Sequence, residues 1–365
     1  MGYDFLNVIG LMTGTSIDGI DISMVKTNGL QLRRLNKNYY YKYNIKTKKK
    51  LINILKEDVI FNLKRKQYLD DFITEQHYLA LKDLDILHMS DLIGFHGQTI
   101  YHNPDKKISI QLGNPKKLAK KLNKSVIFDF RSKDLFLGGQ GAPIAPIYHK
   151  LIIETHGIGL PCCFLNIGGV CNLTFWDGYN LIGFDTGPGN GMIDDVMQAE
   201  FSLPYDEGGR IAASGNVHQG LVDQMMEEPY FKRTGPRSLD RASFNAILEW
   251  PAFSSLPAAD KIATLTAFAA AAICHGIKTL PAIPSHIVLA GGGVHNHTLI
   301  SMIKTFLKTH TRFLLAQDID ADSDFIEAEL MAVLGARHHY GLASTFPQTT
   351  GVSSPQICGR LAPPR

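Results

Sequence analysis

Two stretches of this chain repeat one order of elements: a strand, a glycine-rich loop, a second strand, a tight turn and a third strand. In the first half, the predicted strands cover residues 5–12, 20–27 and 30–44. In the second half, they cover residues 162–167, 170–176 and 181–184. The two stretches share no sequence identity, so the repeat is one of pattern. It predicts two similar α/β domains that face each other across a cleft, where small ligands usually bind.

The length of 365 residues also favours two domains over a single core. We predict an N-terminal α/β domain over residues 1–150 and a C-terminal α/β domain over residues 151–343. Residues 344–365 contain four prolines and no core pattern, and are predicted to form a surface tail. Residues 204–245 are predicted to form loops and short helices that act as a lid. Helices are predicted at 48–65, 68–83, 115–123, 261–277 and 326–337.

Composition excludes several classes of protein. The net charge of +3 is too small to indicate a nucleic-acid partner. The five cysteines have no zinc-site spacing and lie mostly in apolar runs, so we expect buried thiols in a reducing compartment. No apolar run has membrane-spanning length and the first residues do not resemble a signal peptide, so no membrane contact is predicted. A cytoplasmic location is the expectation.

The loop between the first two predicted strands is rich in glycine, hydroxyl groups and carboxylates. It contains Gly14, Thr15, Ser16, Ile17, Asp18, Gly19, Ile20 and Asp21. Glycine lets backbone N–H groups surround an anion, and hydroxyl groups add donors. Carboxylates are compatible with a phosphate when Mg²⁺ accompanies it. The loop therefore predicts a cradle for a metal-bound nucleotide phosphate, with Asp18 as a metal ligand. The alternative is a plain β-hairpin turn.

Two further glycine-rich loops follow predicted strands in the second half. Asp185 ends a strand beside Gly187 and a predicted helix, so its carboxylate is placed to accept a proton. The alternative is a turn in which Asn190 caps that helix. Gly291, Gly292 and Gly293 form a turn that can approach a base or a ribose, or that serves only to connect strand to helix.

Polar residues in the first half and near residue 327 are candidates for contacts with a sugar. His96 and Gln98 lie in a predicted polar loop after a buried strand and could contact hydroxyl groups. Arg131 could bind a carboxylate or phosphate, or could pair with Asp129 or Asp134 as a structural ion pair. Glu327 and Glu329 point to different sides of a predicted helix, so at most one faces a cleft. These patterns leave each alternative open.

Taken together, these motifs resemble the anhydro-N-acetylmuramic acid kinases. The resemblance runs nearly end to end, and so many ordered matches are specific to that family. The segment 233–244 resembles only one branch of it. The matching motifs are residues 14–21, 94–99, 111–114, 129–131, 138–143, 166–169, 184–190, 290–293 and 327–328.

The resemblance implies a two-domain, actin-like, hexokinase-type ATPase fold that uses ATP and Mg²⁺. It implies that ATP and water convert 1,6-anhydro-N-acetylmuramic acid to N-acetylmuramic acid 6-phosphate, in the recycling of bacterial cell-wall fragments. By matching position, Asp185 is the base that activates water. His96, Gln98, Arg131 and Glu327 are expected to bind the sugar. The 14–21 loop, Gly168, Gly169, Gly187 and Gly291–Gly293 are expected to bind the nucleotide.

Two other functions remain open at this stage. One is a different sugar or carboxylate kinase of the same fold. The other is a non-catalytic, ATP-dependent sugar sensor, for which the chain offers little room for an added DNA-binding or peptide-binding domain. The sequence leaves open whether the protein is a homodimer.

Overall fold

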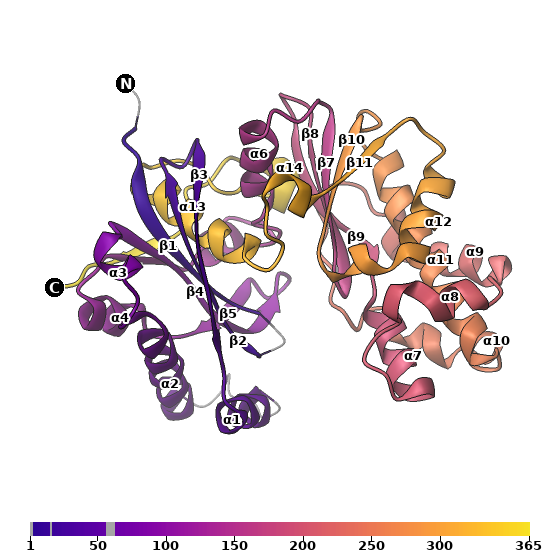
Figure 1. The fold of residues 1–365 in the computed structure, drawn as a ribbon, viewed down its shortest axis with the longest axis horizontal. Coiled ribbons are helices and arrows are strands. Elements are labelled where there is room, and N and C mark those ends of the chain that lie inside the picture. Colours follow the sequence, from indigo (N-terminus) through magenta and orange to yellow (C-terminus); the bar gives the residue numbers. More distant parts are fainter. Residues whose placement is uncertain (1–2, 15–16, 56–62) are drawn as a thin grey trace. The chain divides into compact units, whose positions relative to one another are not determined.

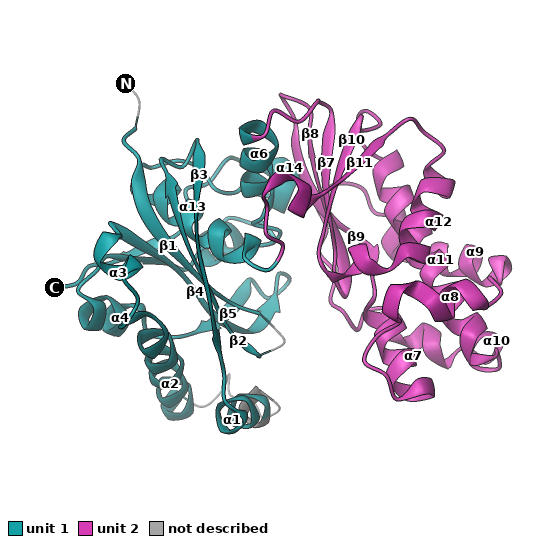
Figure 2. Ribbon diagram, in the orientation of Figure 1, with its two compact units in different colours: residues 1–155, 324–365 teal, residues 156–323 magenta. Residues whose placement is uncertain are grey.

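The computed structural model describes residues 3–14, 17–55 and 63–365. The described chain forms two compact units, drawn in different colours in Figure 2. Unit 1 contains residues 1–155 and 324–365, and unit 2 contains residues 156–323. The chain therefore leaves unit 1 once and returns to it. In the described part of the chain, no helix is both long enough and apolar enough to cross a membrane.

Unit 1 is built on a mixed sheet with the strand order β12-β6-β4-β1-β2-β3, and β5 pairs with β4 (Figure 1). Strands β1, β2 and β3 are antiparallel neighbours, whereas β4 runs parallel to β1 and β6 runs parallel to β4. The central strands are buried along most of their length, and α13 (Ile326–His339) packs on β1, β2 and β4. The strands are β1 (Leu6–Thr13), β2 (Gly19–Thr27), β3 (Leu32–Lys42), β4 (Leu92–Asn103), β5 (Ile108–Leu112), β6 (Val126–Phe128) and β12 (Arg360–Ala362).

The helices predicted in unit 1 are observed, and four further helices, α3 (Ile86–Met89), α5 (Ser132–Phe136), α6 (Pro146–Thr155) and α14 (Pro347–Thr350), were not predicted. The predicted helices 48–65 and 68–83 correspond to α1 (Ile45–Leu55) and α2 (Leu63–Leu81), and residues 56–62 lie outside the described part. The other helices of unit 1 are α4 (Pro115–Leu122) and α13.

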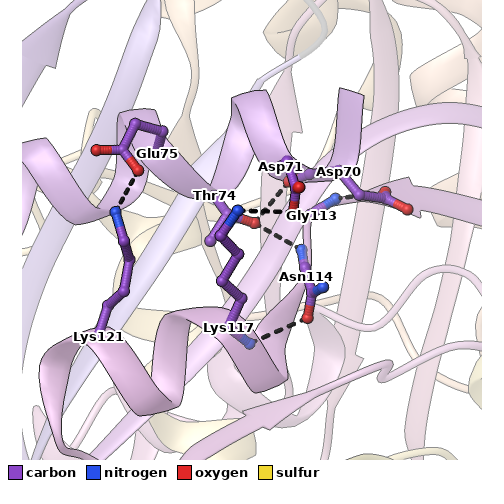
Figure 3. A network of polar contacts seen from close by, with 8 residues as sticks. All are labelled: Asp70, Asp71, Thr74, Glu75, Gly113, Asn114, Lys117 and Lys121. Carbon is purple, nitrogen blue, oxygen red and sulfur yellow. Dashed lines mark hydrogen bonds and ion pairs between the residues drawn. The ribbon is translucent and has the colours of Figure 1, made fainter. Parts of the chain in front are cut away.

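The start of α4 is fixed to α2 by a polar network (Figure 3). The side chain of Asn114 accepts a hydrogen bond from the N–H of Lys117 at 3.0 Å, so Asn114 caps the helix. The N–H of Asn114 donates to the Thr74 hydroxyl at 2.7 Å, and the N–H of Gly113 donates to Asp70 at 3.0 Å. Ion pairs Lys117–Asp71 and Lys121–Glu75 complete the contact between α2 and α4.

The predicted boundary at residue 343 is wrong, because helix α13 belongs to unit 1. This helix packs on β1, β2 and β4. A side chain at Gly10 would overlap the carbonyl oxygen of Ala328, and one at Gly94 would overlap that of Met331. Two glycines in adjacent strands thus let the helix backbone lie directly on the sheet. Sequence pattern revealed the helix but not the sheet that it covers.

The prediction of a surface tail for residues 344–365 is also wrong. Thr345, Thr350 and Cys358 are buried, and β12 pairs antiparallel with β6 at the edge of the sheet. The hydroxyl of Thr350 donates to Asp134 at 2.7 Å. Because small polar side chains make these buried contacts, the segment lacks the apolar periodicity that marks a core element.

Unit 2 repeats the topology of unit 1. Its sheet has the order β11-β10-β7-β8-β9, with β7, β8 and β9 antiparallel and β10 and β11 parallel to β7. This order corresponds to β6-β4-β1-β2-β3 in unit 1, so the predicted structural repeat is confirmed. The strands are β7 (Cys162–Ile167), β8 (Val170–Trp176), β9 (Leu181–Pro188), β10 (His286–Ala290) and β11 (Arg312–Leu315).

The helices of unit 2 gather around the buried helix α11 (Ala258–Lys278). The segment predicted as a lid forms short helices whose aromatic residues Phe231 and Phe244 pack on Phe268 of α11. Its lid role remains a prediction. The other helices are α7 (Gly191–Phe201), α8 (Arg210–Ser214), α9 (Gln219–Met226), α10 (Pro251–Ser254) and α12 (His297–Leu307). Short 3₁₀ helices are η2 (Glu207–Gly209), η3 (Pro229–Lys232), η4 (Asn245–Glu249), η5 (Gly292–His295) and η6 (Ala316–Ile319).

Candidate active site

The predicted phosphate loop connects β1 to β2, and its described residues line a cavity. Thr15 and Ser16 lie outside the described residues, and Ile17 turns the chain with a positive φ of 55°. The antiparallel pairing of β1 and β2 makes the loop a hairpin connection as well as a cavity wall. The cavity, of about 380 Å³, is lined by Gly14, Asp18, Gly19, Asp21, Tyr40, Asp324 and Phe325.

Carboxylates gather at this cavity. Burial and the neighbouring charges of Glu327 and Asp324 together raise the pKa of Asp21 to about 6. Asp18 forms an ion pair with Lys48. Among the described residues, no three His, Cys, Asp or Glu side chains are arranged to hold a metal ion by themselves. A cation here would therefore need oxygen ligands from a nucleotide or from water.

His96 and Arg131 lie together in unit 1. The His96 ring bonds the backbone of Gly97 through Nδ1 at 2.9 Å, and Arg131 Nε lies 3.3 Å from its Nε2. Burial and the charge of Arg131 lower the pKa of His96 to about 3, so this ring is neutral. Burial also lowers the pKa of Arg131, to about 10, while Glu327 and Asp134 oppose that effect.

The structure does not support the alternative role of Arg131 as an ion-pair partner of Asp129 or Asp134. Asp134 accepts hydrogen bonds from the N–H of Gly141 and from Thr350, each at 2.7 Å, and Asp129 lies 3.8 Å from Arg360. Arg131 donates instead to the carbonyl of Gly141 at 2.8 Å. Its guanidinium therefore keeps donor capacity for a ligand.

Gln98 joins this group to the phosphate loop. Its amide nitrogen donates to the carbonyl of Gly14 at 3.1 Å. Its carbonyl oxygen is buried and has no hydrogen-bond partner in the part of the chain that the structure describes. The predicted polar loop around Gln98 is wrong, because β4 continues as a strand through it and pairs with β5. A buried acceptor without a partner suits a ligand hydroxyl.

Glu327 and Glu329 lie on different sides of α13, as predicted. Glu327 is an exposed residue as a whole, but desolvation raises the pKa of its carboxyl group while the charge of Arg131 opposes the shift, and its charge also acts on Asp21. Glu329 is buried and pairs with Arg34 at 2.9 Å, and it also accepts a hydrogen bond from Tyr148. Only Glu327 is therefore placed near the candidate sugar-binding residues.

Asp185 lies on β9 in unit 2 and is held by the segment 230–239. Its carboxylate accepts a hydrogen bond from the N–H of Leu239 at 2.7 Å. Its N–H donates to the carbonyl of Arg237 at 2.9 Å, and its carbonyl accepts from the Tyr230 hydroxyl at 2.6 Å. Burial raises the pKa of Asp185 to about 7, while the Leu239 bond and the charge of Arg237 oppose the shift. The group can accept a proton near neutral pH.

The glycines near Asp185 lie where the turn between β7 and β8 meets the start of α7. The N–H of Asn190 donates to the carbonyl of Gly168, and the N–H of Gly189 donates to that of Gly169, each at 2.9 Å. Gly187 has a φ of 156° and lies against Ala272. Asn190 makes no side-chain hydrogen bond that caps α7, so the predicted alternative of a capped turn is wrong.

The turn at Gly291–Gly293 borders the second cavity, of about 720 Å³, a size suited to a nucleoside. Only Gly292 lines it; Gly291 adopts a positive φ, and Gly293 packs against Ile167. Sequence reasoning missed the other polar residues of this wall because contacts distant in sequence assemble them. They are Asn190, Asp194, Asp206, Glu207, Arg210, His295, Asn296 and His297.

Comparison with known proteins gives the same family as the sequence motifs. The family model for anhydro-N-acetylmuramic acid kinase matches residues 6–364. A protein of that name from Rhodopseudomonas palustris (strain BisB18) is 36% identical, over 98% of this chain and 100% of its own length. Another from Zymomonas mobilis is 39% identical, over 97% of this chain and 98% of its own length. The duplicated sheets are those of the predicted two-domain, actin-like ATPase fold. The chain belongs to the anhydro-N-acetylmuramic acid kinase family.

Proposed function

We propose that this protein uses ATP and water to convert 1,6-anhydro-N-acetylmuramic acid to N-acetylmuramic acid 6-phosphate and ADP. The observation that carries the proposal is the family match over residues 6–364. Relatives of the same name match over nearly their full length, which favours this activity over another sugar or carboxylate kinase and over a sensor.

Asp185 is the proposed general base. It takes a proton from water as the water oxygen bonds to the anomeric carbon. The bond from that carbon to O6 breaks, and O6 then bonds to the γ-phosphorus while the bond to the ADP oxygen breaks. A base titrating near neutrality suits this task, and the pKa of Asp185, about 7, supports the assignment.

Sugar recognition is assigned to unit 1. Arg131 is proposed to bind the lactyl carboxylate, because its guanidinium contacts the Gly141 carbonyl and the neutral His96 ring and forms no ion pair with an acid among the described residues. The unpaired carbonyl oxygen of Gln98 is proposed to accept a hydrogen bond from a sugar hydroxyl. Glu327 is the proposed acceptor for a further hydroxyl.

ATP is assigned to the glycine-rich loops. In unit 1, the 14–21 loop is a proposed contact of its phosphates. In unit 2, Gly168, Gly169 and Gly187 are proposed phosphate contacts, and the cavity beside Gly291–Gly293 is proposed to hold its nucleoside. Mg²⁺ fits the carboxylates at the first cavity, where Asp18 and Asp21 would hold it together with phosphate oxygens. Bound there, it would neutralise phosphate charge. A cytoplasmic location and a homodimer remain proposals, the latter testable by light scattering.

The substitution Asp185→Asn tests the proposal. It keeps the size and most hydrogen bonds of the side chain but cannot accept the proton. We expect a loss in kcat of at least about a hundredfold, with ATP affinity largely kept. The control is nucleotide binding and thermal melting of the same variant. A folded variant that opens the anhydro-sugar at nearly the wild-type rate would remove Asp185 from the mechanism.

A further inference from the structure

Arg237 is a buried cation whose hydrogen-bonding capacity is mostly unused. Only 3% of the surface of Arg237 is exposed to solvent. One guanidinium nitrogen, Nη1, donates to the carbonyl of Arg233 at 2.9 Å. The other two, Nε and Nη2, have no hydrogen-bond partner among the described residues. A buried charge of this kind is costly unless a neighbouring group compensates it.

The surroundings of Arg237 point to Asp185 as that group. The guanidinium carbon lies 4.3 Å from the ring centre of Phe184 and 5.5 Å from that of Tyr230. Phe184 immediately precedes Asp185, and the carbonyl of Arg237 accepts the N–H of Asp185. Stacking on Phe184 and this backbone bond hold the guanidinium close to the backbone of Asp185. From this position its charge lowers the pKa of Asp185, and no ion pair joins the two side chains among the described residues.

We propose that Arg237 is a positioning residue that keeps the Asp185 carboxylate ionised and ready to accept a proton. The inference rests on the proposed function, because it assigns a role through Asp185. Arg237 does not touch the reacting atoms; its positive charge acts through the base.

The other ionisable groups around Asp185 do not supply this positive charge. Burial raises the pKa of Cys171 on β8 and of Tyr230 in η3 far above neutrality, so both are uncharged there. Arg233 is exposed, and Arg241 pairs with Asp195 at 2.6 Å.

His275 of α11 is a further ionisable group in this region. Its ring forms a hydrogen bond with the backbone carbonyl of Phe231, at 3.0 Å. The Leu239 N–H also favours the ionised form of Asp185, but it is a neutral donor. Removing the Arg237 charge should therefore raise the pKa of Asp185 above 7.

The experiment is the pH profile of kcat/KM for Arg237→Met. The acidic limb should move to higher pH by at least about one unit, which is at the low end of the effect of a neighbouring opposite charge. Activity at pH 7 should fall about tenfold or more and recover toward pH 9. Arg237→Lys keeps the charge, so its acidic limb should stay close to the wild-type position. The matched control is Arg233→Met, which removes an exposed guanidinium from the same segment and should leave the profile unchanged.

Two results would overturn the inference. One is a uniform loss of activity at all pH values with no shift of the acidic limb. The other is failure of both neutral variants, Arg237→Met and Arg237→Gln, to fold, because Arg237 would then serve the fold rather than the charge on Asp185. These results differ from failure of the proposed function. If Asp185→Asn keeps wild-type turnover, the base assignment is wrong; if it is inactive and Arg237→Met shows no shift, only the role of Arg237 is wrong.

Discussion

At the scale of single residues, Asp21 is a carboxylate whose negative charge is unfavourable in the folded protein. Burial and the acidic neighbours Glu327 and Asp324 raise its pKa to about 6. The ionised form of Asp21 would be more favourable if Glu327 and Asp324 were neutral or absent. Accumulated like charge of this kind is typical of a site that a cation or substrate completes.

Asp21→Asn should therefore stabilise the ligand-free protein at neutral pH. An acid whose pKa rises from 3.8 to about 6 on folding binds more protons when folded, so its cost is absent below about pH 4 and full above about pH 6. We expect the melting temperature of the variant in EDTA to exceed that of the wild type by roughly 1–4 °C at pH 7.5. The difference should shrink as the pH falls through 6 and vanish near 4.

The exposed residue Asp83 offers a control for that prediction, since Asp83→Asn removes a carboxylate from the same unit. Its melting temperature relative to the wild type should not follow the same pH course. Equal pH courses for the two variants would contradict the role given to the acidic neighbours of Asp21.

At the scale of elements, helix α13 separates two glutamates into different tasks. Glu329 ties the helix to β3 through Arg34 and to α6 through Tyr148, and these contacts are buried. Glu327 is an exposed residue, and its charge interacts with those of Arg131 and Asp21. One helical turn thus serves both packing and the candidate site.

A matched pair of variants separates these tasks. Glu329→Ala removes the carboxylate that pairs with Arg34 and accepts from Tyr148, and we expect a loss of about 3–5 kcal/mol in the free energy of unfolding. Glu327→Ala should leave the unfolding free energy nearly unchanged while kcat/KM for the anhydro-sugar falls. Denaturant unfolding and steady-state kinetics measure both. A reversal of these two effects would show that the sides of α13 have been assigned wrongly.

The same helix shows what sequence could predict and what it could not. Apolar periodicity predicted a helix at 326–337, close to the observed Ile326–His339, and the strands of both repeats were placed within a few residues. Periodicity says that a helix has a buried face, but not which sheet buries it. The predicted boundary therefore fell after α13, although Gly10 and Gly94 mark the sheet that receives it.

The candidate site was predictable only in part. Asp185 and Arg131 stand in glycine-rich motifs, so their positions carry a local signal. Arg237 and Leu239 reach Asp185 from more than fifty residues along the chain, and no local pattern indicates that contact. Strand β5 was missed because its residues are mostly exposed or half-buried and do not form an apolar run.

At the scale of the whole molecule, the candidate residues divide between the two units. The 14–21 loop, His96, Gln98, Arg131 and Glu327 belong to unit 1, whereas Asp185 and the Gly291–Gly293 turn belong to unit 2. The proposed reaction needs sugar, water and ATP together. The central claim is therefore chemical: one turnover consumes water at the sugar and ATP at O6.

Turnover in ¹⁸O-labelled water, read by mass spectrometry, tests that claim most directly. The anhydro-sugar, ATP and Mg²⁺ are incubated with the protein and quenched early, and unlabelled N-acetylmuramic acid 6-phosphate in the same water controls for exchange at the anomeric carbon. The account predicts one ¹⁸O on the anomeric carbon of the product, none in the transferred phosphate, and one ADP for each sugar opened. Label in released phosphate, or a sugar phosphate with no label above the exchange control, would contradict it.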